Sequence, residues 1–378
     1  MVYEITDENE IKLLHFSNLP FDENDINSCE GTASFRPVEV LLSGLNRPGE
    51  RHGTKYTYTA PGYRLKYKDM KDYRNETGRK LEILMEDKPT GLEVCSNIQF
   101  YDGISVIRSW TELKNNGEED LGVEYVSSFA LLGIDKEGLL STDEKLEVLI
   151  ARNAWQKELI WNRFSMDQLG MSISQPDKVR RSSQTISVGN TGNWSTKNYL
   201  PMGCLKNKET DSILFWQIEQ NGSWYWEISD QDGHMYLQLS GTTEHQSHWW
   251  KNLKPGDTFA SVPVSVGSAC GDVEEAAGEL TKYRRAIRRK NEDNEKLPVI
   301  FNDYMNCLWG DPTTEKELPL IDKAKEAGCE YFCVDCGWYS AGFWWDGVGE
   351  WLPSKERFPG GLKEVMDYIR SKGMVPGV

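Results

Sequence analysis

The first 268 residues read as a succession of short β-strands. Apolar positions there alternate with polar ones or run together briefly, and β-branched and aromatic residues are frequent. The segments that show this pattern are 33–44, 80–87, 92–115, 212–220, 223–230 and 235–241. No helical pattern of about 10–15 residues alternates with them, which argues against βαβ units in this part of the chain. The pattern predicts a large antiparallel β-sandwich over residues 1–268.

Pairs of turn-forming residues separate the predicted strands. They are Asn116-Gly117, Asn221-Gly222, Asp232-Gly233 and Pro255-Gly256. The stretch "EQNGSWYWEI" is especially typical of a hairpin, because Asn-Gly readily adopts the positive φ angles of a two-residue turn. We therefore expect the strands on either side of Asn221-Gly222 to pair with each other.

The chain changes character after residue 268. Residues 271–291 predict a helix in which acidic residues lead and basic residues follow, as the helix dipole favours. Asp272 followed by Glu275 has the spacing of a capping box at the start of that helix. A charged polar stretch then leads to Pro298. We interpret residues 269–297 as a linker helix and a linker.

After Pro298 strands and helices alternate. Strands are predicted at 299–304, 331–338 and 374–378, and helices at 314–328 and 362–373. Such alternation with short connections requires parallel strands. Asn302, Asp303 and Asp335 stand at strand ends, like the polar residues at the C-terminal rim of a (β/α)8 barrel. Because eight such units need about 250 residues, residues 298–378 are expected to be the first part of a barrel, truncated here.

The stretch "CEYFCVDCGWY" can be read in two ways. Cys329, Cys333 and Cys336 have the C-x3-C-x2-C spacing of some iron–sulfur sites, whereas the apolar run to Asp335 predicts a buried strand that delivers a carboxylate. An extended strand rises about 3.3 Å per residue, so Cys329 and Cys333 would lie about 13 Å apart. That distance is too large for one cluster, and we interpret the cysteines as buried thiols.

Composition narrows the class of protein. The net charge of -16 argues against a nucleic-acid partner, and no apolar run approaches the roughly 18 residues of a membrane span. The acidic N-terminal segment lacks the features of a secretion signal. Eight cysteines in 378 residues without such a signal indicate reduced thiols and a cytoplasmic location. No dinucleotide or phosphate-binding fingerprint occurs, so no cofactor is expected.

Aromatic residues are unusually frequent. Fourteen Trp and sixteen Tyr include clusters at 224–226, 248–250 and 343–345. Aromatic faces bind the apolar faces of sugars, and their N–H and O–H groups serve hydroxyls, although core packing accounts for such residues equally well. His245 and His248 have the spacing of a metal pair, but no third ligand is evident. Hydrogen-bonding or structural roles are favoured for them, and no metal is expected.

With these features placed, the chain resembles the α-galactosidases of glycoside hydrolase family 36. The segments that carry the resemblance are 298–309 ("PVIFNDYMNCLW"), 332–339 ("FCVDCGWY"), 348–378, 190–201 ("NTGNWSTKNYLP") and 222–228 ("GSWYWEI"). The likeness covers nearly all 378 residues. It implies a multidomain β plus α/β protein, in which an N-terminal antiparallel β-supersandwich is followed by the start of a (β/α)8 TIM barrel.

The resemblance also implies a sugar-binding site. Asp335 would accept hydrogen bonds from galactose hydroxyls, and Tyr304 takes the place of an aromatic platform that is usually Trp. Trp338 and Trp351 would wall the sugar subsite. Trp194, from a sandwich loop, could reach over the barrel mouth of a neighbouring subunit in an oligomer.

Two positions depart from the family pattern. Cys336 replaces the second Asp of an Asp-Asp-Gly-Trp motif, and a thiol cannot serve as an ionised acceptor for the axial hydroxyl of galactose. Ser34 stands where the family often has Asp. The resemblance therefore implies a sugar site whose preference for galactose is altered at Cys336.

The chemistry implied is retaining hydrolysis of a small α-galactoside, which releases terminal α-linked galactose by double displacement between two carboxylates about 5–5.5 Å apart. The family nucleophile follows a Lys-Trp pair, and Lys-Trp-Asp does not occur in this sequence. Both catalytic aspartates are therefore expected after Val378, which leaves this chain inactive alone. A homo-oligomer through the sandwich is expected. The alternatives are an α-N-acetylgalactosaminidase of the same family and a non-catalytic carbohydrate-binding module.

Overall fold

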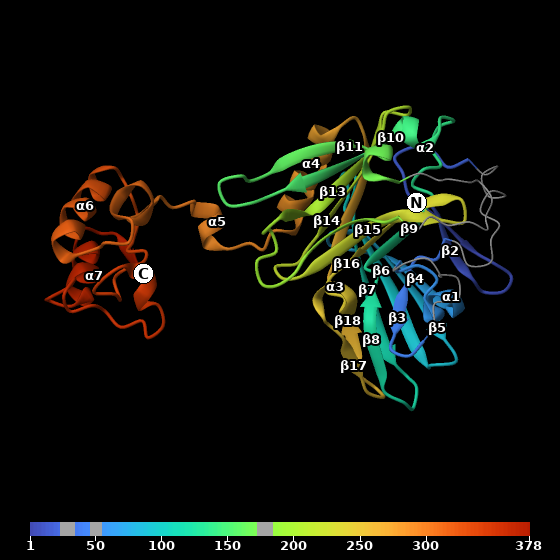
Figure 1. The fold of residues 1–378 in the computed structure, drawn as a ribbon, viewed down its shortest axis with the longest axis horizontal. Helices are drawn as coiled ribbons and strands as arrows, with labels where there is room; N and C mark the ends of the chain where they lie inside the picture. Colours follow the sequence, from blue (N-terminus) through green and yellow to red (C-terminus); the bar gives the residue numbers. More distant parts are fainter. Residues whose placement is uncertain (23–34, 46–54, 172–183) are drawn as a thin grey trace. The chain divides into compact units, whose positions relative to one another are not determined.

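The computed structural model describes residues 1–22, 35–45, 55–171 and 184–378. Two compact units make up the chain, residues 1–287 and residues 288–378, and each is considered by itself (Figure 1). The first unit consists mainly of antiparallel strands, and the second of parallel strands with helices. Ser34 lies outside the described residues.

The first unit is built around one large antiparallel sheet. Its strands follow the order β11 (Ile160–Ser165), β10 (Leu146–Arg152), β13 (Tyr199–Asn207), β14 (Ser212–Ile218), β19 (Val264–Cys270), β7 (Val106–Asn115), β6 (Leu92–Phe100), β5 (Gly78–Asp87) and β4 (Lys66–Asn75), and β18 (Thr258–Ala260) also pairs with β7. The antiparallel strands predicted from the sequence are thus confirmed in this sheet.

Smaller antiparallel sheets complete the first unit. They are β12 (Ile186–Asn190), β15 (Trp224–Gln231), β16 (His234–Ser240) and β9 (Phe129–Leu132); β17 (Lys251–Leu253), β8 (Leu121–Val126) and β3 (Val40–Leu42); and β1 (Val2–Ile5) with β2 (Ile11–His15). The helices are short, apart from the last: α1 (Ala60–Arg64), α2 (Thr142–Lys145), a 3-10 turn (Asp167–Leu169), α3 (Glu244–Ser247) and α4 (Val273–Ile287).

The apolar faces of these sheets form a shared core. In β5 every second side chain is buried, including those of Leu81, Ile83 and Met85, as the period of a strand requires. Trp216 of β14 meets Trp226 of β15 edge to face, with ring centroids 5.1 Å apart. Because β14 and β15 belong to different sheets, this contact joins two layers of the sandwich.

The turn pairs behave in two different ways. Asp232-Gly233 links β15 to β16 as a two-residue turn, with φ angles of 52° and 80°, as the sequence predicts. The hairpin expected at Asn221-Gly222 is wrong. Neither residue has a positive φ, and β14 and β15 lie in separate sheets. The chain crosses between layers there, because the two buried tryptophan-bearing strands each pair with other neighbours.

The helix predicted after residue 268 is α4, and its start differs in one detail from the capping box expected. The Glu275 carboxylate accepts the Asp272 backbone N–H at 2.8 Å, which is half of that motif. The Asp272 side chain instead accepts the Val273 N–H, and both of its oxygens accept from Nη2 of Arg163 at 2.8 Å. A salt bridge to β11 thus takes the place of the second half of the box.

The second unit contains three parallel strands in the order β20 (Ile300–Asn302), β21 (Tyr331–Cys333) and β22 (Val375–Gly377). The remaining elements are α5 (Glu292–Lys296), an irregular turn (Tyr304–Leu308), α6 (Thr314–Glu326), a 3-10 turn (Trp344–Gly347) and α7 (Leu362–Ser371). The predicted alternation of parallel strands and helices is confirmed, although the strands are shorter than expected.

One face of this parallel sheet packs against the helices. Phe301 and Phe332 stack with centroids 5.1 Å apart, and Phe332 lies in a core with Ile321 of α6 and Val365 of α7. The neighbouring row of the sheet points the other way, and Ile300 and Val375 are exposed. The strand predicted within residues 299–304 is therefore covered on only one of its faces within this unit.

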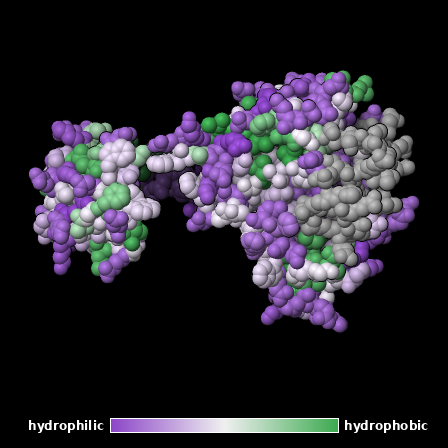
Figure 2. All heavy atoms as spheres, in the orientation of Figure 1, coloured by the Kyte–Doolittle hydropathy of each residue, from purple (hydrophilic) through white to green (hydrophobic). Residues whose placement is uncertain are grey.

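The surface of the chain is largely hydrophilic in the view of Figure 2, with hydrophobic side chains in small patches. None of the helices in the described ranges has the length and apolar character needed to span a membrane.

A buried carboxylate holds residues 55–65 against β3. Glu39 accepts the backbone N–H groups of Tyr58 at 3.1 Å and Thr59 at 3.0 Å, together with the Thr59 hydroxyl. Burial raises the pKa of Glu39 to about 7, and the hydrogen bonds from Thr59 and Tyr58 oppose that rise. The folded protein therefore binds a proton at Glu39 that the unfolded chain has already released near neutral pH.

We expect Glu39→Gln to stabilise the protein relative to wild type as the pH rises. In wild type, the raised pKa of Glu39 in the folded state increases the free energy of unfolding, and this contribution is complete below about pH 4.5. It is lost as the pH rises towards about 7, whereas the variant has no such group to titrate. The relative gain of the variant between about pH 5 and about pH 8 should be on the order of 2–3 kcal/mol. Urea unfolding measures it, with exposed Glu118→Gln as the control, and equal pH dependence in all three proteins would contradict the prediction.

Candidate functional site

The carboxyl ends of β20 and β21 lie side by side in the second unit. Asn302 and Cys333 are partners in the parallel register. The Asn302 side-chain amide donates to the Asp335 carboxylate, with 2.8 Å between Nδ2 and Oδ2. Its oxygen accepts the Tyr304 backbone N–H at 2.9 Å. The Asn302 amide is thus held by both its nitrogen and its oxygen, and it orients the Asp335 carboxylate. The polar residues predicted at the two strand ends therefore contact each other.

Two contacts of Asp303 fix the backbone of residues 333–335. Asp303 Oδ1 accepts the Asp335 N–H at 2.7 Å, and the Asp303 N–H donates to the Cys333 carbonyl at 3.2 Å. Gly337 follows with a φ of +89°, and a Cβ there would come within 2.0 Å of the Gly310 carbonyl oxygen. Only glycine fits this close approach, which explains how the chain turns directly after the carboxylate.

Cys336 contacts the same carboxylate. Its thiol lies beside Asp335, and burial together with that carboxylate raises the pKa of Cys336 to about 11. The thiol is therefore neutral near neutral pH and can donate to Asp335, whereas a second Asp would be an acceptor. The rim thus has one charged acceptor fewer than it would have with Asp at position 336.

The other cysteines of the motif lie in different environments. Cys329 is buried in the apolar core of the second unit, as the interpretation of buried thiols predicts. Cys333 and Cys336 are only half-buried, so the interpretation as buried thiols is wrong for these two. Cys333 is the last residue of β21, and Cys336 lies in the turn after it, where the strand no longer covers its neighbours. Within the described ranges, no group of three or more His, Cys, Asp or Glu side chains could hold a metal ion.

Aromatic rings gather in two groups close to these strand ends. Tyr304 meets Trp344 edge to face at 6.0 Å between centroids. Trp351 meets Tyr339 at 4.6 Å and Trp338 at 6.4 Å. Trp351 is 52% exposed, whereas Trp338 is half-buried and packs against the apolar core. Three of the predicted aromatic residues therefore lie in the same unit as Asp335, with exposed ring surface at Trp351.

Trp194 belongs to the first unit. It lies in the connection between β12 and β13, where its carbonyl accepts the side-chain amide of Asn190 at 2.7 Å. Its side chain is 52% exposed. The sugar contact predicted for Trp194 stays a prediction.

Arg357 holds the loop 338–347, which carries several of these aromatic residues, in place. Its buried guanidinium donates to the carbonyls of Ser340 and Gly342, the latter at 2.7 Å, and pairs with the Asp311 carboxylate. These contacts join the loop 338–347 to the turn before α6. The position of Trp344 and Tyr339 thus depends on a residue that lies more than ten positions further along the chain.

The sequence predicts Asn302 and Asp303 at strand ends and Trp344 in an aromatic cluster, but not the contacts that these residues make. Glu317 and Arg357 have no predicted role at all. A signal existed for Glu317, because it shares the helical spacing of the buried residues Ile321 and Ala324 and so stands on the apolar face of α6. No comparable local signal marks Arg357, whose partners are backbone carbonyls and the carboxylate of Asp311, far away in the sequence.

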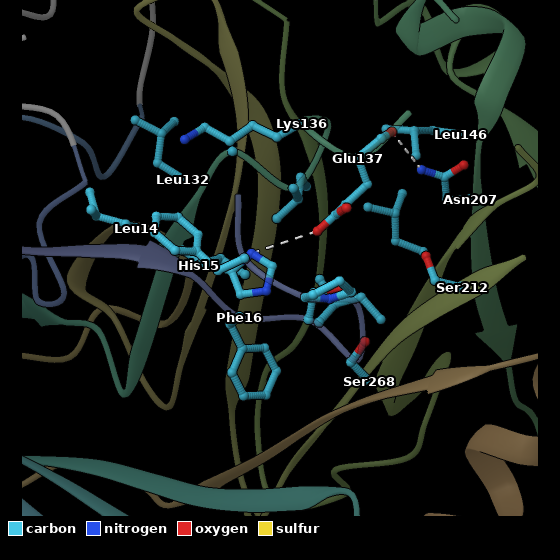
Figure 3. A pocket seen from close by; sticks show the side chains of 18 residues that line it. Leu14, His15, Phe16, Leu132, Lys136, Glu137, Leu146, Asn207, Ser212 and Ser268 are labelled. Atoms are coloured by element: carbon cyan, nitrogen blue, oxygen red, sulfur yellow. Dashed lines mark hydrogen bonds and ion pairs between the residues drawn. The ribbon is translucent and has the colours of Figure 1, made fainter. Parts of the chain in front are cut away.

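A separate pocket lies in the first unit (Figure 3). His15 of β2 points towards Glu137 across it, with 3.6 Å from Nδ1 to Oε1, and its Nε2 lies 2.9 Å from the Leu19 carbonyl oxygen. The pocket lining contains none of the residues predicted to bind sugar.

Comparison with known proteins finds relatives of the chain among the α-galactosidases. Residues 264–378 match the Melibiase family. Alpha-galactosidase Mel36A of Lactobacillus acidophilus is 24% identical over 315 residues, which is 80% of this chain and 39% of the relative. Probable alpha-galactosidase G of Aspergillus terreus is 22% identical over 281 residues, 71% of this chain and 34% of the relative.

Solved structures share the fold. GH36 alpha-galactosidase AgaA from Geobacillus stearothermophilus has a TM-score of 0.75 at 16% identity, covering 99% of this chain and 54% of that protein. The galactosidase domain of AgaSK has a TM-score of 0.72 at 17% identity, again over 99% of this chain and 54% of the other. The chain thus spans between about a third and a half of these proteins, and the family resemblance is confirmed.

We expect Arg357→Gln to release the loop 338–347. The change removes an ion pair and leaves buried carbonyls without donors, at a cost of about 2–4 kcal/mol. Hydrogen exchange of the backbone amides in this loop should become faster, while exchange in the first unit should not change. Arg357→Lys retains the charge but loses the planar fork, and should be intermediate. Unchanged protection of the loop in Arg357→Gln would contradict this role.

Proposed function

Because the chain is a relative of the α-galactosidases of glycoside hydrolase family 36, we propose that it is part of a retaining glycoside hydrolase that releases terminal α-linked galactose from oligosaccharides. The observation that supports this most is the Asp335 carboxylate, oriented by Asn302 at the end of parallel strands and close in sequence to exposed aromatic residues. Sites at the C-terminal ends of parallel strands are where α/β enzymes bind their substrates.

The groups present match the two faces of a hexose. A carboxylate accepts hydrogen bonds from vicinal hydroxyls, and charged acceptors make the stronger bonds of this kind. Tyr304, Trp338 and Trp351 offer aromatic surface to the C–H face of the ring. One structure similar to this chain is an AgaA variant in complex with raffinose, and another is in complex with 1-deoxygalactonojirimycin. We infer that a terminal galactosyl residue is the group bound.

The second unit is proposed to be the beginning of a (β/α)8 barrel. Its strands are parallel, its helices cover one face of the sheet, and the exposed row with Ile300 and Val375 faces away from them. In a barrel such a row lies in the interior. The match over 99% of this chain to proteins about twice as long supports this arrangement.

The double displacement needs two accessible carboxylates. Asp303 and Glu317 are buried and cannot reach a glycosidic bond, which leaves Asp335 as the oriented carboxylate in the rim. We therefore assign Asp335 to substrate binding, and the nucleophile and the acid/base to later strands of the parent protein. On this proposal the 378-residue chain binds galactose without hydrolysis, and turnover of an aryl α-galactoside by the purified chain would refute it.

Two further expectations from the sequence are kept as proposals. One is an oligomer assembled through the first unit, in which the half-exposed side chain of Trp194 would cover a neighbouring sugar site. The cytoplasmic location is proposed from the reduced cysteines alone.

We expect Asp335→Asn to weaken the binding of methyl α-D-galactoside. The amide cannot provide the charged acceptor, so the loss should be about 1.5–3 kcal/mol, or on the order of 10- to 100-fold in Kd. Titration calorimetry on the 378-residue chain provides the measurement. Asp346→Asn changes an exposed carboxylate in the neighbouring 3-10 turn and should bind like wild type. Equal affinities for all three proteins would remove the assignment of Asp335.

We expect Cys336→Asp to increase the preference for galactose over glucose. The change replaces a neutral thiol with a charged acceptor suited to the axial hydroxyl. The ratio of affinities for methyl α-D-galactoside and methyl α-D-glucoside should rise by about tenfold, since one hydrogen bond to a charged group is worth about 1.5–3 kcal/mol. Cys336→Ser, which keeps a small neutral group, is the control. No change in the ratio would show that position 336 does not contact the axial hydroxyl.

A further inference from the structure

Two fully buried carboxyl groups lie next to the proposed sugar site. Asp303, directly after β20, is 1% exposed, and Glu317, in the first turns of α6, is 0% exposed. Acidic side chains are almost never buried to this extent unless they are paired. Neither residue has an assigned role in the binding of sugar, and neither reaches solvent.

Most of the carboxyl oxygens of these two groups lack donors from the rest of the described chain. Asp303 Oδ1 accepts the Asp335 N–H, which leaves Oδ2. In the part of the chain that the structure describes, no N–H or O–H group donates to Asp303 Oδ2 or to either oxygen of Glu317. The side chains of Asp303 and Glu317 face each other, and each alters the pKa of the other. Two ionised carboxylates can only accept, so a hydrogen bond between them requires that one of the pair is protonated.

The charges around the pair oppose a second ionisation. The acidic groups that face it are the Asp335 carboxylate and the thiols of Cys307, Cys333 and Cys336. Lys316, next to Glu317 in α6, pairs with Asp311 instead. Burial, followed by the hydrogen bond and charge of Asp303, raises the pKa of Glu317 well above its ordinary value. The proton therefore resides mainly on Glu317, and the titration belongs to the pair.

We propose that Glu317 and Asp303 share one proton and act together as positioning residues that fix Asp335 for sugar binding. The protonated Glu317 donates to Asp303, whose other oxygen accepts the Asp335 backbone N–H. Asn302 then holds the Asp335 carboxylate itself. This inference rests on the proposed function only in assigning sugar to Asp335, because the proton-sharing pair stands on its own contacts.

The arrangement links helix α6 to the rim of the sheet. As long as the pair holds one proton, a single negative charge is delocalised over buried groups that hydrogen-bond to each other. Loss of that proton at alkaline pH places two like charges in contact without a counterion, so the carboxyls separate. Asp303 then no longer holds the Asp335 N–H, and the orientation of the site is lost while the rest of the fold persists.

The experiment follows the Asp335 amide directly. Protein labelled with 15N at aspartate is titrated from about pH 6 to about pH 10, and the Asp335 resonance is assigned through Asp335→Asn. We expect this resonance to shift in one step above neutral pH in wild type. In Glu317→Gln, whose amide donates to Asp303 but cannot ionise, the step should be absent. Exposed Glu315→Gln, in the same helix turn, should titrate like wild type.

Binding of methyl α-D-galactoside provides the functional readout. Wild-type affinity should fall about tenfold or more across the alkaline step, whereas Glu317→Gln should keep its affinity over the same range, with circular dichroism showing both proteins folded. A step that persists in Glu317→Gln, or its absence in wild type, would overturn the shared proton. A normal step with pH-independent affinity would overturn the positioning role. A normal step without sugar binding at any pH would instead contradict the proposed function and leave the pair intact.

Discussion

The hydrogen bond from the Asp335 N–H to the buried carboxyl of Asp303 is the interaction on which the site depends. β20 and β21 are each only three residues long, and helix α6 lies between them in the sequence. Ladder hydrogen bonds alone do not define how the chain leaves such short strands. Asp303 ties the end of one strand to the turn after the other, and Asn302 repeats this connection at the level of side chains. Together they convert two adjacent strand ends into an oriented carboxylate.

Connecting the strand ends through Asp303 and Glu317 costs free energy of folding, because each buried carboxyl loses its hydration. The cost is reduced when one proton serves both groups. An apolar residue at position 317 would avoid the desolvation, but it would leave Asp303 as a lone buried charge. The burial of Glu317 on the same helix face as Ile321 and Ala324 thus makes sense only through its partner on the sheet.

The aromatic part of the site is supported in a different way. Trp338 packs partly in the core, whereas Trp351 and Trp344 lie in a region with little regular secondary structure. Arg357 compensates for the missing ladder bonds by donating to several carbonyls of the loop. The site therefore combines a rigid carboxylate at the strand ends with aromatic rings held by one buried guanidinium. Strand patterns in the sequence therefore predict the position of the Asp335 carboxylate, but they do not predict that Arg357 supports the loop.

The sequence by itself determined the class of each unit and the location of its chemistry. Backbone geometry sets the period of two for burial in strands such as β5 and the helical spacing in α6 and α7, so both are visible in the sequence. The polar residues after Asn302 and Val334 likewise mark the ends of strands locally. Only the tertiary structure decided which strands pair and which side chains meet. Asn221-Gly222 has the chemistry of a hairpin, yet burial of Trp216 and Trp226 in facing sheets separates the strands around it. The contact of Glu317 with Asp303 is likewise invisible in sequence, because long-range packing, and not local preference, brings two carboxyls together and removes water from them.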